Sequence, residues 1–575
     1  MTNNFGSKTL ALRSLNYWRN RSHLSYFALR SLLLRSNDFD LGIVLSSAEA
    51  LLPRIGSLSF SDLIYKGTSD GKHSYRTITA LSPHFAILEA FILANLSTLP
   101  ATFHDEQVFS YRWPKSKNPS RFFEFYRQYY EERNELIHKA MQVCDSSVAV
   151  SMDIKAFYPS CSQEQCLRVL AESVRGYDFG GLTIRYVKAI FSTVSKGLPV
   201  GPAISHVIGN LVMRTLDSQL KKIPSLLYTR YVDDMVFVVK ESDAEKTIEA
   251  VQDVFSSTDF ECQQSKTDVT ALSEWRQHSP KYSSPSDSDS FEAIESRIQM
   301  YLLFKPQKAH FLTEFLKDNS ISLNVDWLQS NLSNSRWQGF VRSQRKVKWL
   351  RDGWRAAFLD NEASILKRCV VVRKSMMRTY ENLLQEPQPV SKTAAKWRNK
   401  KIGYLALRLS QLFPRENLDY LESSVSACDL PSVTAILQDL QRQTFEHSLP
   451  FPGSAINFLC AHWNVSGWEV PTLNVEGNPA LYSALSIVTQ MSVNIPEPSF
   501  NDINKGAADL LRWLVEQPGY PEAPLETFQR ELQCIISGEN FNDARKIIQK
   551  TRFSDGEAVD GASFALEVIA SLQSG

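Results

Sequence analysis

The chain has 575 residues, of which 43% are hydrophobic and 22% are charged, and its formal net charge is +1. This composition is typical of a globular protein in water, and the length allows at least two substantial cores. Eight cysteines are scattered without a C-x-x-C pair, which argues against a zinc site or a disulfide framework and fits a reducing cytoplasm. No apolar run approaches the ~18 residues that a membrane span needs, so we expect no membrane partner.

The first 37 residues contain six lysines and arginines but no acidic residue. A mitochondrial transit peptide has this composition, and so does a helical hairpin that packs on a core and touches a phosphate backbone. The apolar pattern continues without a break through LGIVLSSAEALL, which favours the second interpretation. We therefore predict a basic helical segment over residues 1–58.

The most informative stretch is LLYTRYVDDMVFVVK, residues 226–240, in which Asp233 and Asp234 interrupt a run of strand-forming residues. Carboxylates are depleted from strands and are rarely buried without a partner or a metal. Strand formers on both sides predict a β-hairpin whose tight turn carries the two carboxylates. A solvated hairpin tip would also fit, but such pairs hold divalent metals in phosphoryl transfer, where two ions lie ~3.5–4 Å apart.

A two-metal site needs a further carboxylate from another strand. In SSVAVSMDIKAFYPSC, the alternation of Val148, Val150 and Met152 predicts a strand that ends at Asp153. Between the two acidic positions, KGLPVGPAISHVIGNLVMRTLDSQL predicts a Gly/Pro loop and then a helix of about four turns that begins at Ser205. A glycine-rich loop that leads into a helix N-terminus suits backbone contact with a phosphate or a base pair.

In this order, DIKAFYPS, GLPVGPAIS and YVDD resemble motifs A, B and C of the reverse transcriptase palm, and FECQQSKTDV resembles motif D. Upstream, SYRTITALSPHFAILEAFILANL and VFSYRWP resemble the fingers segments of bacterial reverse transcriptases. The resemblance implies an α+β fold over residues 59–275, with fingers and a palm built from an antiparallel sheet and flanking helices. It also implies an RNA-directed DNA polymerase, a nucleotidyltransferase that joins dNTPs by two-metal phosphoryl transfer.

The resemblance assigns the catalytic roles position by position. Asp153 and Asp233 would ligate two Mg²⁺ ions, with Mn²⁺ as an alternative ion. Asp234 and the backbone carbonyl of Ile154 would complete the protein's ligands. Lys266 would protonate the pyrophosphate leaving group or stabilise its charge.

Two sets of substrate contacts in the palm are implied as well. Tyr158 matches the aromatic position that lies beneath the sugar and excludes a 2′-hydroxyl, so that deoxynucleotides are favoured. The alternative interpretation is a core tyrosine, a role that the neighbouring Phe157 also fits, and both remain substrate-binding candidates. Gly201 and Pro202 would touch the nascent base pair.

In the fingers, three basic residues, Lys66, Lys72 and Arg76, flank a predicted SDGK turn. The resemblance implies that one or two of them grip the triphosphate. Each could equally be a solvated surface charge.

One position departs from the family pattern. Most reverse transcriptases have glutamine before the motif B glycine, and Val200 stands there in this chain. This variant resembles the abortive-infection and defence-associated enzymes of bacteria, which implies a cytoplasmic bacterial protein that makes DNA during phage infection. It would either copy a partner non-coding RNA or work without a template and prime on protein. The alternatives are a retron- or group II intron-like enzyme and a catalytically inactive nucleic-acid-binding scaffold.

The second half of the chain reads differently. A Ser/Asp/Pro-rich stretch predicts a flexible linker or loop over residues 276–292. Helical patterns then dominate, with the strand-like CVVVRK as the main exception, and predict a large all-α C-terminal domain over residues 293–575 without a fixed repeat. Residues 336–401 hold 17 Lys/Arg against 5 Asp/Glu, whereas residues 421–575 hold 8 against 19.

The basic stretch also contains aromatic residues, namely Trp337, Trp349, Trp354, Tyr380 and Trp397. This mixture fits a channel for a single strand, where phosphates are neutralised and bases stack, or else ordinary amphipathic helices. The acidic end could cover that channel or form an assembly interface, and the resemblance implies a homo-oligomer. RQTFEH, residues 442–447, matches the R-x4-H spacing of HEPN ribonucleases, but a surface helix without a catalytic task is the favoured interpretation of Arg442 and His447.

Overall fold

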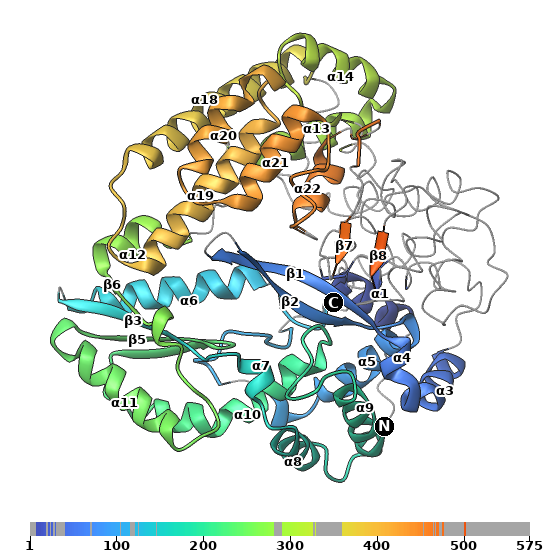
Figure 1. The fold of residues 1–575 in the computed structure, drawn as a ribbon, viewed down its shortest axis with the longest axis vertical. Helices are drawn as coiled ribbons and strands as arrows, with labels where there is room; N and C mark the ends of the chain where they lie inside the picture. The colour runs from blue at the N-terminus through green and yellow to red at the C-terminus, as the bar shows by residue number, and fades with distance from the viewer. Residues whose placement is uncertain are drawn as a thin grey trace.

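The computed structural model describes residues 7–328 and 359–470, with short gaps, and the strands β7 (Asn474–Glu476) and β8 (Ser499–Asn501). The gaps are residues 19–20, 23–24, 27–28, 30–40, 70–71, 104, 115–120, 125, 145, 281–289, 326–327, 452–453, 464 and 466. Figure 1 shows the C-terminal helices arching over a lower part that contains the N-terminal helices, a long hairpin and a small sheet. Within the described residues, no helix has both the length and the apolarity to cross a bilayer.

A four-stranded antiparallel sheet forms the predicted palm. Its strands are β3 (Ser147–Asp153), β4 (Leu227–Tyr231), β5 (Asp234–Lys240) and β6 (Asp268–Ala271). The strand order is β4-β5-β3-β6, and β3 pairs with β5 along its whole length. Because both faces of β3 and β5 are buried, these strands read as nearly continuous apolar runs up to the residues where the carboxylates begin.

Helices cover both faces of this sheet. On one face, Val150 and Phe237 belong to the main core together with Val207 and Val251 of the palm helices. On the other face, Ala149 and Val236 pack with side chains from three further helices. The helices of the first face are α10 (Ile204–Leu220) and α11 (Ala244–Ser256), and those of the second are α6 (Tyr126–Met141), α12 (Leu272–His278) and α19 (Lys392–Ser410). Behind the first face, α8 (Gln163–Ser173) packs on α10, and α9 (Gly180–Phe191) packs on α8.

The predicted fingers consist of a long hairpin and the helices behind it. The strands β1 (Phe60–Ser69) and β2 (Lys72–Ala80) pair antiparallel, with a register shift between Tyr65 and Gly67. The N-terminal helices pack on α5 (Pro83–Leu96), and the Ser14 hydroxyl donates a 2.7 Å hydrogen bond to the Ala86 carbonyl oxygen. The helices that pack on α5 are α1 (Ser7–Trp18) and α3 (Leu41–Leu51), whereas α4 (Ile55–Leu58) packs on α9. The described part of residues 1–58 is therefore mostly helical and packs on the helices behind the hairpin.

The C-terminal region is helical over most of its described residues. Its helices are α13 (Phe291–Phe304), α14 (Ala309–Asp318), α18 (Glu362–Gln385), α20 (Leu418–Ser426), α21 (Pro431–Arg442) and α22 (Ser454–His462). The short elements of the described residues are α7 (Phe157–Ser160) and the 3-10 turns Leu52–Arg54, Pro100–Thr102, Glu241–Asp243, Gln264–Lys266, Pro306–Lys308 and Arg415–Asn417.

Two expectations for this region need correction. The stretch CVVVRK, residues 369–374, is not a strand but lies inside α18. Cys369, Val372 and Met376 are buried at helical spacing, so packing on neighbouring helices overrides the strand preference of the β-branched run. The region is also not all-α, because β7 and β8 form a short parallel pair.

Several predicted features fall partly outside the described residues. The predicted linker begins inside α12, and its residues 281–289 are not described. Trp337, Trp349 and Trp354 of the basic stretch lie outside as well, as does most of the acidic stretch beyond residue 470. The described part of the basic stretch consists mainly of α18 and α19.

Candidate active site

Three carboxylates lie together at one end of the palm sheet. β3 ends at Asp153, and β5 begins at Asp234, which lies directly opposite Asp153 in the register. The turn between β4 and β5 consists of Val232 and Asp233. The Ile154 amide donates a 3.3 Å hydrogen bond to the Asp233 carbonyl oxygen, which joins this turn to the end of β3. The predicted hairpin is therefore present, and its turn carries Asp233.

The conformation of this turn is unusual and is held by a buried arginine. Val232 has a φ of 58°, a left-handed conformation that β-branched residues rarely adopt. The Arg230 guanidinium, which is 1% exposed, donates hydrogen bonds to the Val232 carbonyl oxygen at 2.7 Å and to Asn210 Oδ1 at 3.1 Å. It also donates one 2.7 Å hydrogen bond to each carboxylate oxygen of Asp217, which accepts a third from the Tyr228 hydroxyl.

Sequence analysis missed this buried network. Its signal was present, since Arg230 interrupts a strand and Asp217 interrupts an apolar helix. Charged residues at such positions are seldom buried unless they are paired. The pairing of Arg230 with Asp217 depends on the tertiary fold, and the local sequence pattern does not predict it.

Burial and the charges of neighbouring carboxylates raise the pKa of Asp153 and of Asp233. Burial, followed by the charges of Asp153 and Asp234, raises the pKa of Asp233 to about 6. Burial also raises the pKa of Asp153, and the Lys266 ammonium group, 2.8 Å from Asp153 Oδ1, acts against that rise. Additional positive charge at this end of the sheet would therefore stabilise the ionised carboxylates.

The donor chemistry fits Mg²⁺, although the protein supplies an incomplete set of ligands. Within the described residues, no group of three or more His, Cys, Asp or Glu side chains is arranged to enclose a metal ion. Mg²⁺ commonly takes one or two protein carboxylates and completes its shell with water and substrate phosphates. Asp153, Asp233 and Asp234 are hard oxygen donors of the right kind, and the raised pKa of Asp233 has a cause that a bound cation would relieve.

The motif B loop approaches the fingers so closely that only glycine fits. Gly201 has a φ of 122°, and a Cβ atom there would lie 2.4 Å from the Thr79 carbonyl oxygen on β2. The Thr79 amide donates a 2.7 Å hydrogen bond to the carbonyl oxygen of Val200, the residue that replaces the usual glutamine. Pro202 follows at the start of α10, where the Ile204 amide donates a 3.1 Å hydrogen bond to buried Glu89. The loop is thus part of the wall between palm and fingers.

The two aromatic candidates of motif A are both buried. Phe157, 3% exposed, packs on Phe260 and lies against Gly209 of α10, so it is part of the core. Tyr158 is 8% exposed, and its hydroxyl is hydrogen-bonded to Nδ1 of His206 at 2.5 Å. The two residues therefore differ in chemistry, since Tyr158 ends in a polar contact and Phe157 does not.

Comparison with known proteins identifies the family. The model of the family "Reverse transcriptase (RNA-dependent DNA polymerase)" matches residues 64–350. The chain carries a reverse transcriptase domain. This domain is an RNA-directed DNA polymerase, a nucleotidyltransferase.

The other comparisons add little. Among solved structures, the chain is similar to apo telomerase from Candida Tropicalis, with 11% identity over 66% of this chain and 69% of that chain and a TM-score of 0.27. It is also similar to telomerase from Candida albicans in complex with a TWJ fragment of telomeric RNA, with 10% identity over 67% of each chain and a TM-score of 0.26. TM-scores this low carry no argument about fold or function. No curated protein matches the chain.

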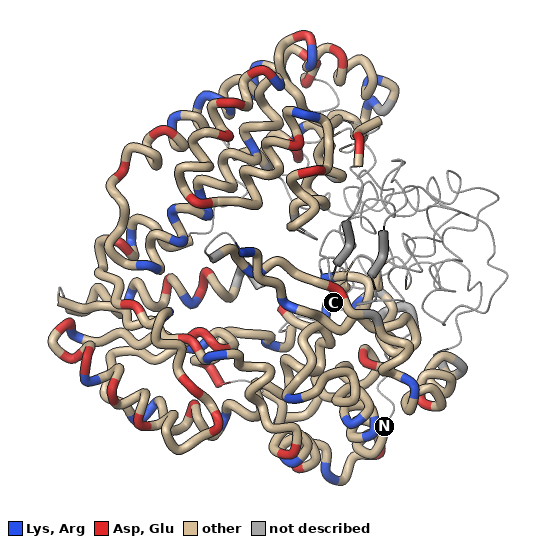
Figure 2. The backbone as a smooth tube through the Cα atoms, viewed as in Figure 1, with Lys and Arg blue, Asp and Glu red and all other residues tan. Residues whose placement is uncertain are grey.

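A stripe of lysines runs along helix α19 of the C-terminal region and begins beside Lys266. Lys392, Lys396 and Lys400 are exposed at successive i, i+4 positions, and Lys392 Nζ donates to the Ser265 carbonyl oxygen at 3.2 Å. Lys396 lowers the pKa of Asp153 through its charge. Figure 2 shows basic residues gathered at the end of α19 that faces the palm. The sequence predicted a basic stretch here but not which of its residues lie near the carboxylates.

Contacts with the palm fix the start of α19. Asp268 on β6 accepts hydrogen bonds from the Ser391 hydroxyl at 2.7 Å and from the Thr393 amide at 2.8 Å. The side chains of Trp275 and Trp397 pack edge to face, with ring centroids 4.9 Å apart. The lysine stripe is therefore held at a fixed distance from the carboxylates.

The three basic candidates in the fingers lie on the β1–β2 hairpin. Lys66, Lys72 and Arg76 are all exposed, and Arg76 lies opposite Ile64 in the register. They lie on β1 and β2, whereas the carboxylates lie at the end of β3, in the β4–β5 turn and at the start of β5. Two of the residues in the SDGK turn, 70 and 71, lie outside the described part of the chain.

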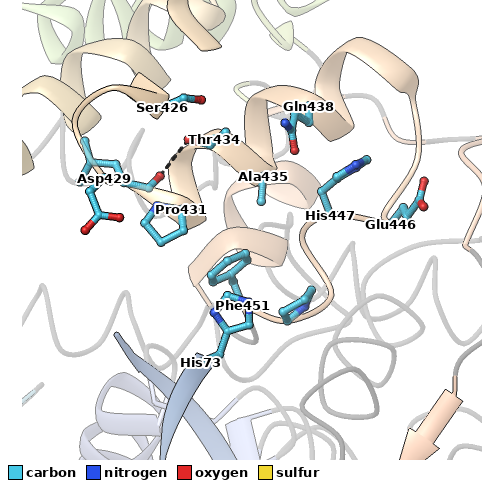
Figure 3. A pocket seen from close by; sticks show the side chains of 12 residues that line it. His73, Ser426, Asp429, Pro431, Thr434, Ala435, Gln438, Glu446, His447 and Phe451 are labelled. Carbon is cyan, nitrogen blue, oxygen red and sulfur yellow. Dashed lines mark hydrogen bonds between the residues drawn. The ribbon is translucent and has the colours of Figure 1, made fainter. Parts of the chain in front are cut away.

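The same hairpin touches the C-terminal region of the reverse transcriptase. The Tyr75 hydroxyl donates a 2.7 Å hydrogen bond to the Pro450 carbonyl oxygen. The Phe451 ring packs on Tyr65 and His73, with centroid distances of 4.8 and 5.0 Å. A cavity of about 480 Å³ adjoins this contact and is lined by residues of both parts, including His73, Gln438 and His447 (Figure 3).

The structure also brings Arg442 and His447 together. Arg442 Nη1 lies 2.9 Å from His447 Nε2, and His447 Nδ1 lies 2.9 Å from Oδ1 of fully buried Asp439. Asp439 additionally accepts hydrogen bonds from the amides of His447 and Ser448. These contacts fasten the loop that carries Pro450 and Phe451 to the end of α21, which is a sufficient structural reason for the cluster.

Proposed function

We propose that this reverse transcriptase is a bacterial antiviral enzyme that synthesises DNA from dNTPs by two-metal phosphoryl transfer. The observation that carries the chemistry is the β3–β5 register, which sets Asp153 opposite Asp234 and beside Asp233. The place of Val200 in motif B supports the defence-associated group. The same proposal includes a cytoplasmic bacterial location and a homo-oligomer. It also divides the chain into domains or segments that end at residues 58, 275 and 292.

Each candidate residue has a role in this reaction. Asp153, Asp233 and Asp234 would hold two Mg²⁺ ions, together with the Ile154 carbonyl. When bound, such ions neutralise the attacking and leaving oxygens of an in-line displacement. Lys266, whose ammonium group already lies 2.8 Å from Asp153, would donate a proton to the pyrophosphate or stabilise its charge.

The substrate is held by the surrounding walls. The ring of Tyr158 would lie beneath the sugar and exclude a 2′-hydroxyl, with buried Phe157 behind it. Gly201 and Pro202 would contact the nascent base pair, and the close approach of Gly201 to Thr79 of β2 would hold their loop in place. Lys66, Lys72 and Arg76 of the hairpin would then grip the triphosphate.

The stripe of Lys392, Lys396 and Lys400 supports a place for the product strand. Three like charges at i, i+4 spacing repel one another, so the arrangement costs stability unless an anion lies against it. Phosphates of a nucleic acid strand next to the carboxylates would meet this condition. The template is either a partner non-coding RNA or absent, and in the second case synthesis is primed on protein.

The test combines a polymerase assay with an infection assay. The purified full-length protein is treated with RNase or DNase and then given labelled dNTPs and Mg²⁺. We expect incorporation by the wild type and none by Asp233→Asn/Asp234→Asn, whereas Asp253→Asn, a surface control on α11, retains it. RNase-sensitive incorporation identifies an RNA template, and label that remains on denatured protein identifies protein priming.

The infection assay tests the antiviral role separately. Cells that express the wild type or Asp253→Asn should reduce phage plaque numbers, and cells that express the double variant should not. Incorporation without any plaque reduction would overturn the defence role alone. Equal behaviour of wild type and double variant in the polymerase assay would favour the scaffold alternative.

A further inference from the structure

A chain of three hydrogen bonds joins the two walls of the nucleotide site. The Tyr158 hydroxyl lies 2.5 Å from His206 Nδ1, and His206 Nε2 lies 3.1 Å from the Tyr17 hydroxyl. The Tyr17 hydroxyl in turn donates to the Gly201 carbonyl oxygen at 2.7 Å. Tyr158, His206 and Tyr17 are only 8%, 7% and 6% exposed, so water does not compete strongly for these contacts.

The Gly201 carbonyl oxygen, at the end of this series of hydrogen bonds, determines which group donates in each of them. A carbonyl oxygen only accepts, so the single hydroxyl proton of Tyr17 points to Gly201. The Tyr17 oxygen must therefore accept from His206 Nε2–H. A neutral imidazole then has a bare Nδ1, which must accept the hydroxyl proton of Tyr158. All three donors thus point the same way, from Tyr158 toward Gly201.

The surroundings of His206 keep it neutral and fix its plane. Burial, and then the charge of Arg21, holds the pKa of His206 well below its usual value. Tyr111 stacks flat on the imidazole, with ring centroids 3.6 Å apart and planes 5° from parallel. The Arg21 guanidinium lies over the Tyr17 ring at 3.8 Å. The His206 imidazole is therefore held in one tautomer and one orientation relative to the Tyr158 hydroxyl.

Tyr17 lies outside the region that the family model matches. That match begins at residue 64, whereas Tyr17 is on α1, which packs on α5 behind the fingers. The N-terminal helix therefore contributes a side chain to a contact between motif A and motif B, although no catalytic motif lies in it.

We propose that Tyr17 and His206 are positioning residues that set the sugar selectivity of the polymerase. They tether the Tyr158 hydroxyl to the backbone of Gly201, and so fix the gap between the ring beneath the sugar and the loop that contacts the base pair. When the tether is cut, the Tyr158 hydroxyl keeps only its hydrogen bond with Tyr111, so the ring can tilt and the gap admits a 2′-hydroxyl. This inference rests on the role of Tyr158 proposed above.

The test measures selectivity on the full-length protein. The ratio of kcat/KM for dTTP to that for 5-methyluridine triphosphate, two substrates that differ only in the 2′-hydroxyl, is determined on oligo(dT)-primed poly(rA). Template-free incorporation of dATP and ATP gives the same ratio if the enzyme needs no template. Because both substrates are measured on one preparation, a reduced fraction of folded protein cancels in the ratio.

The variants separate the tether from the ring. Tyr17→Phe and Tyr158→Phe each remove one hydroxyl oxygen, and His206→Leu removes both hydrogen bonds of the imidazole. Tyr158→Ala removes the phenol ring itself. A net hydrogen bond of about 0.5–1.5 kcal/mol corresponds to a loss of selectivity of about 2- to 12-fold for Tyr17→Phe and Tyr158→Phe. Tyr158→Ala should lose more. Tyr380→Phe, which alters a buried tyrosine of α18, should leave the ratio unchanged.

Three results would overturn the inference in distinguishable ways. If Tyr158→Ala lowers the ratio but Tyr17→Phe, Tyr158→Phe and His206→Leu leave it unchanged, the ring excludes the hydroxyl without the tether. If Tyr158→Ala polymerises with unchanged selectivity, Tyr158 does not act on the sugar, and the proposed role fails together with the inference. A loss of melting temperature in Tyr17→Phe without a change in the ratio would show a structural role only.

Discussion

Replacing Arg230 with methionine should destabilise the palm strongly, because it leaves a buried carboxylate without its partner. Arg230 is 1% exposed and donates to both oxygens of Asp217, which is itself 4% exposed. Breaking one half of a buried ion pair costs about 3–5 kcal/mol. At roughly 2–4 °C for each kcal/mol, the melting temperature should fall by roughly 6–20 °C.

The assay is thermal unfolding followed by intrinsic fluorescence at neutral pH. Lys246→Met, at a lysine that is 81% exposed, serves as the control and should shift the midpoint little. In the double variant Arg230→Met/Asp217→Asn, the uncompensated charge is gone while Tyr228 keeps an acceptor. Its melting temperature should therefore be higher than that of Arg230→Met alone.

The same variants report on the catalytic turn. Arg230 Nη1 also donates to the carbonyl oxygen of left-handed Val232, directly before Asp233. Activity per folded molecule should therefore fall in Arg230→Met and in the double variant alike. The reasoning is refuted if the midpoint of Arg230→Met shifts no more than the control, or if the two substitutions are additive.

Four further outcomes can be checked independently. Burial raises the pKa of Glu89 to about 7, so the contribution of Glu89 to stability should be fully present below about pH 4.5 and be lost as the pH rises through 7. Glu89→Gln should remove this fall and raise stability at pH 8 by roughly 3 kcal/mol, and parallel pH profiles of melting temperature would contradict it. Lys266→Met should lower the rate of nucleotide addition in a single turnover by about 10²- to 10⁴-fold, and Lys266→Arg should recover part of that rate. An unchanged rate in Lys266→Met would exclude proton donation by Lys266. Lys396→Gln and Lys400→Gln should each reduce the salt slope of oligonucleotide binding by about 0.7–0.9, measured by fluorescence anisotropy, and an unchanged slope would place the strand elsewhere. Gly201→Ala should abolish incorporation, because its Cβ would meet the Thr79 carbonyl oxygen at 2.4 Å, and full activity would mean that the loop moves away from β2.

Local patterns account for what could be predicted from the sequence. The alternation of apolar and smaller residues predicted the strand that ends at Asp153. Strand-forming residues on both sides of two carboxylates predicted the hairpin at Asp233. The Gly/Pro loop predicted the start of α10 to within one residue of Ile204. These features depend on neighbours in the chain, so the sequence carries them directly. The roles of the individual residues stay predictions.

Contacts between distant residues account for what was missed. Tyr17 and His206 are 189 residues apart in the chain, and nothing near either of them indicates the other. The run CVVVRK was misread for a related reason, because its β-branched residues favour a strand until neighbouring helices cover one side of α18. Partner choice in both cases is decided by packing in three dimensions.

The contact between the β1–β2 hairpin and the loop after α21 sets how often the two sides separate. Among the described residues, one hydrogen bond from Tyr75 to Pro450 and two ring contacts of Phe451 join the two sides. At about 0.5–1.5 kcal/mol for each contact, separation costs about 1.5–4.5 kcal/mol. That corresponds to about one molecule in ten to one in two thousand with the contact open at any moment. A nucleic acid strand that passed between the hairpin and the helices would therefore have to break only weak contacts among the described residues.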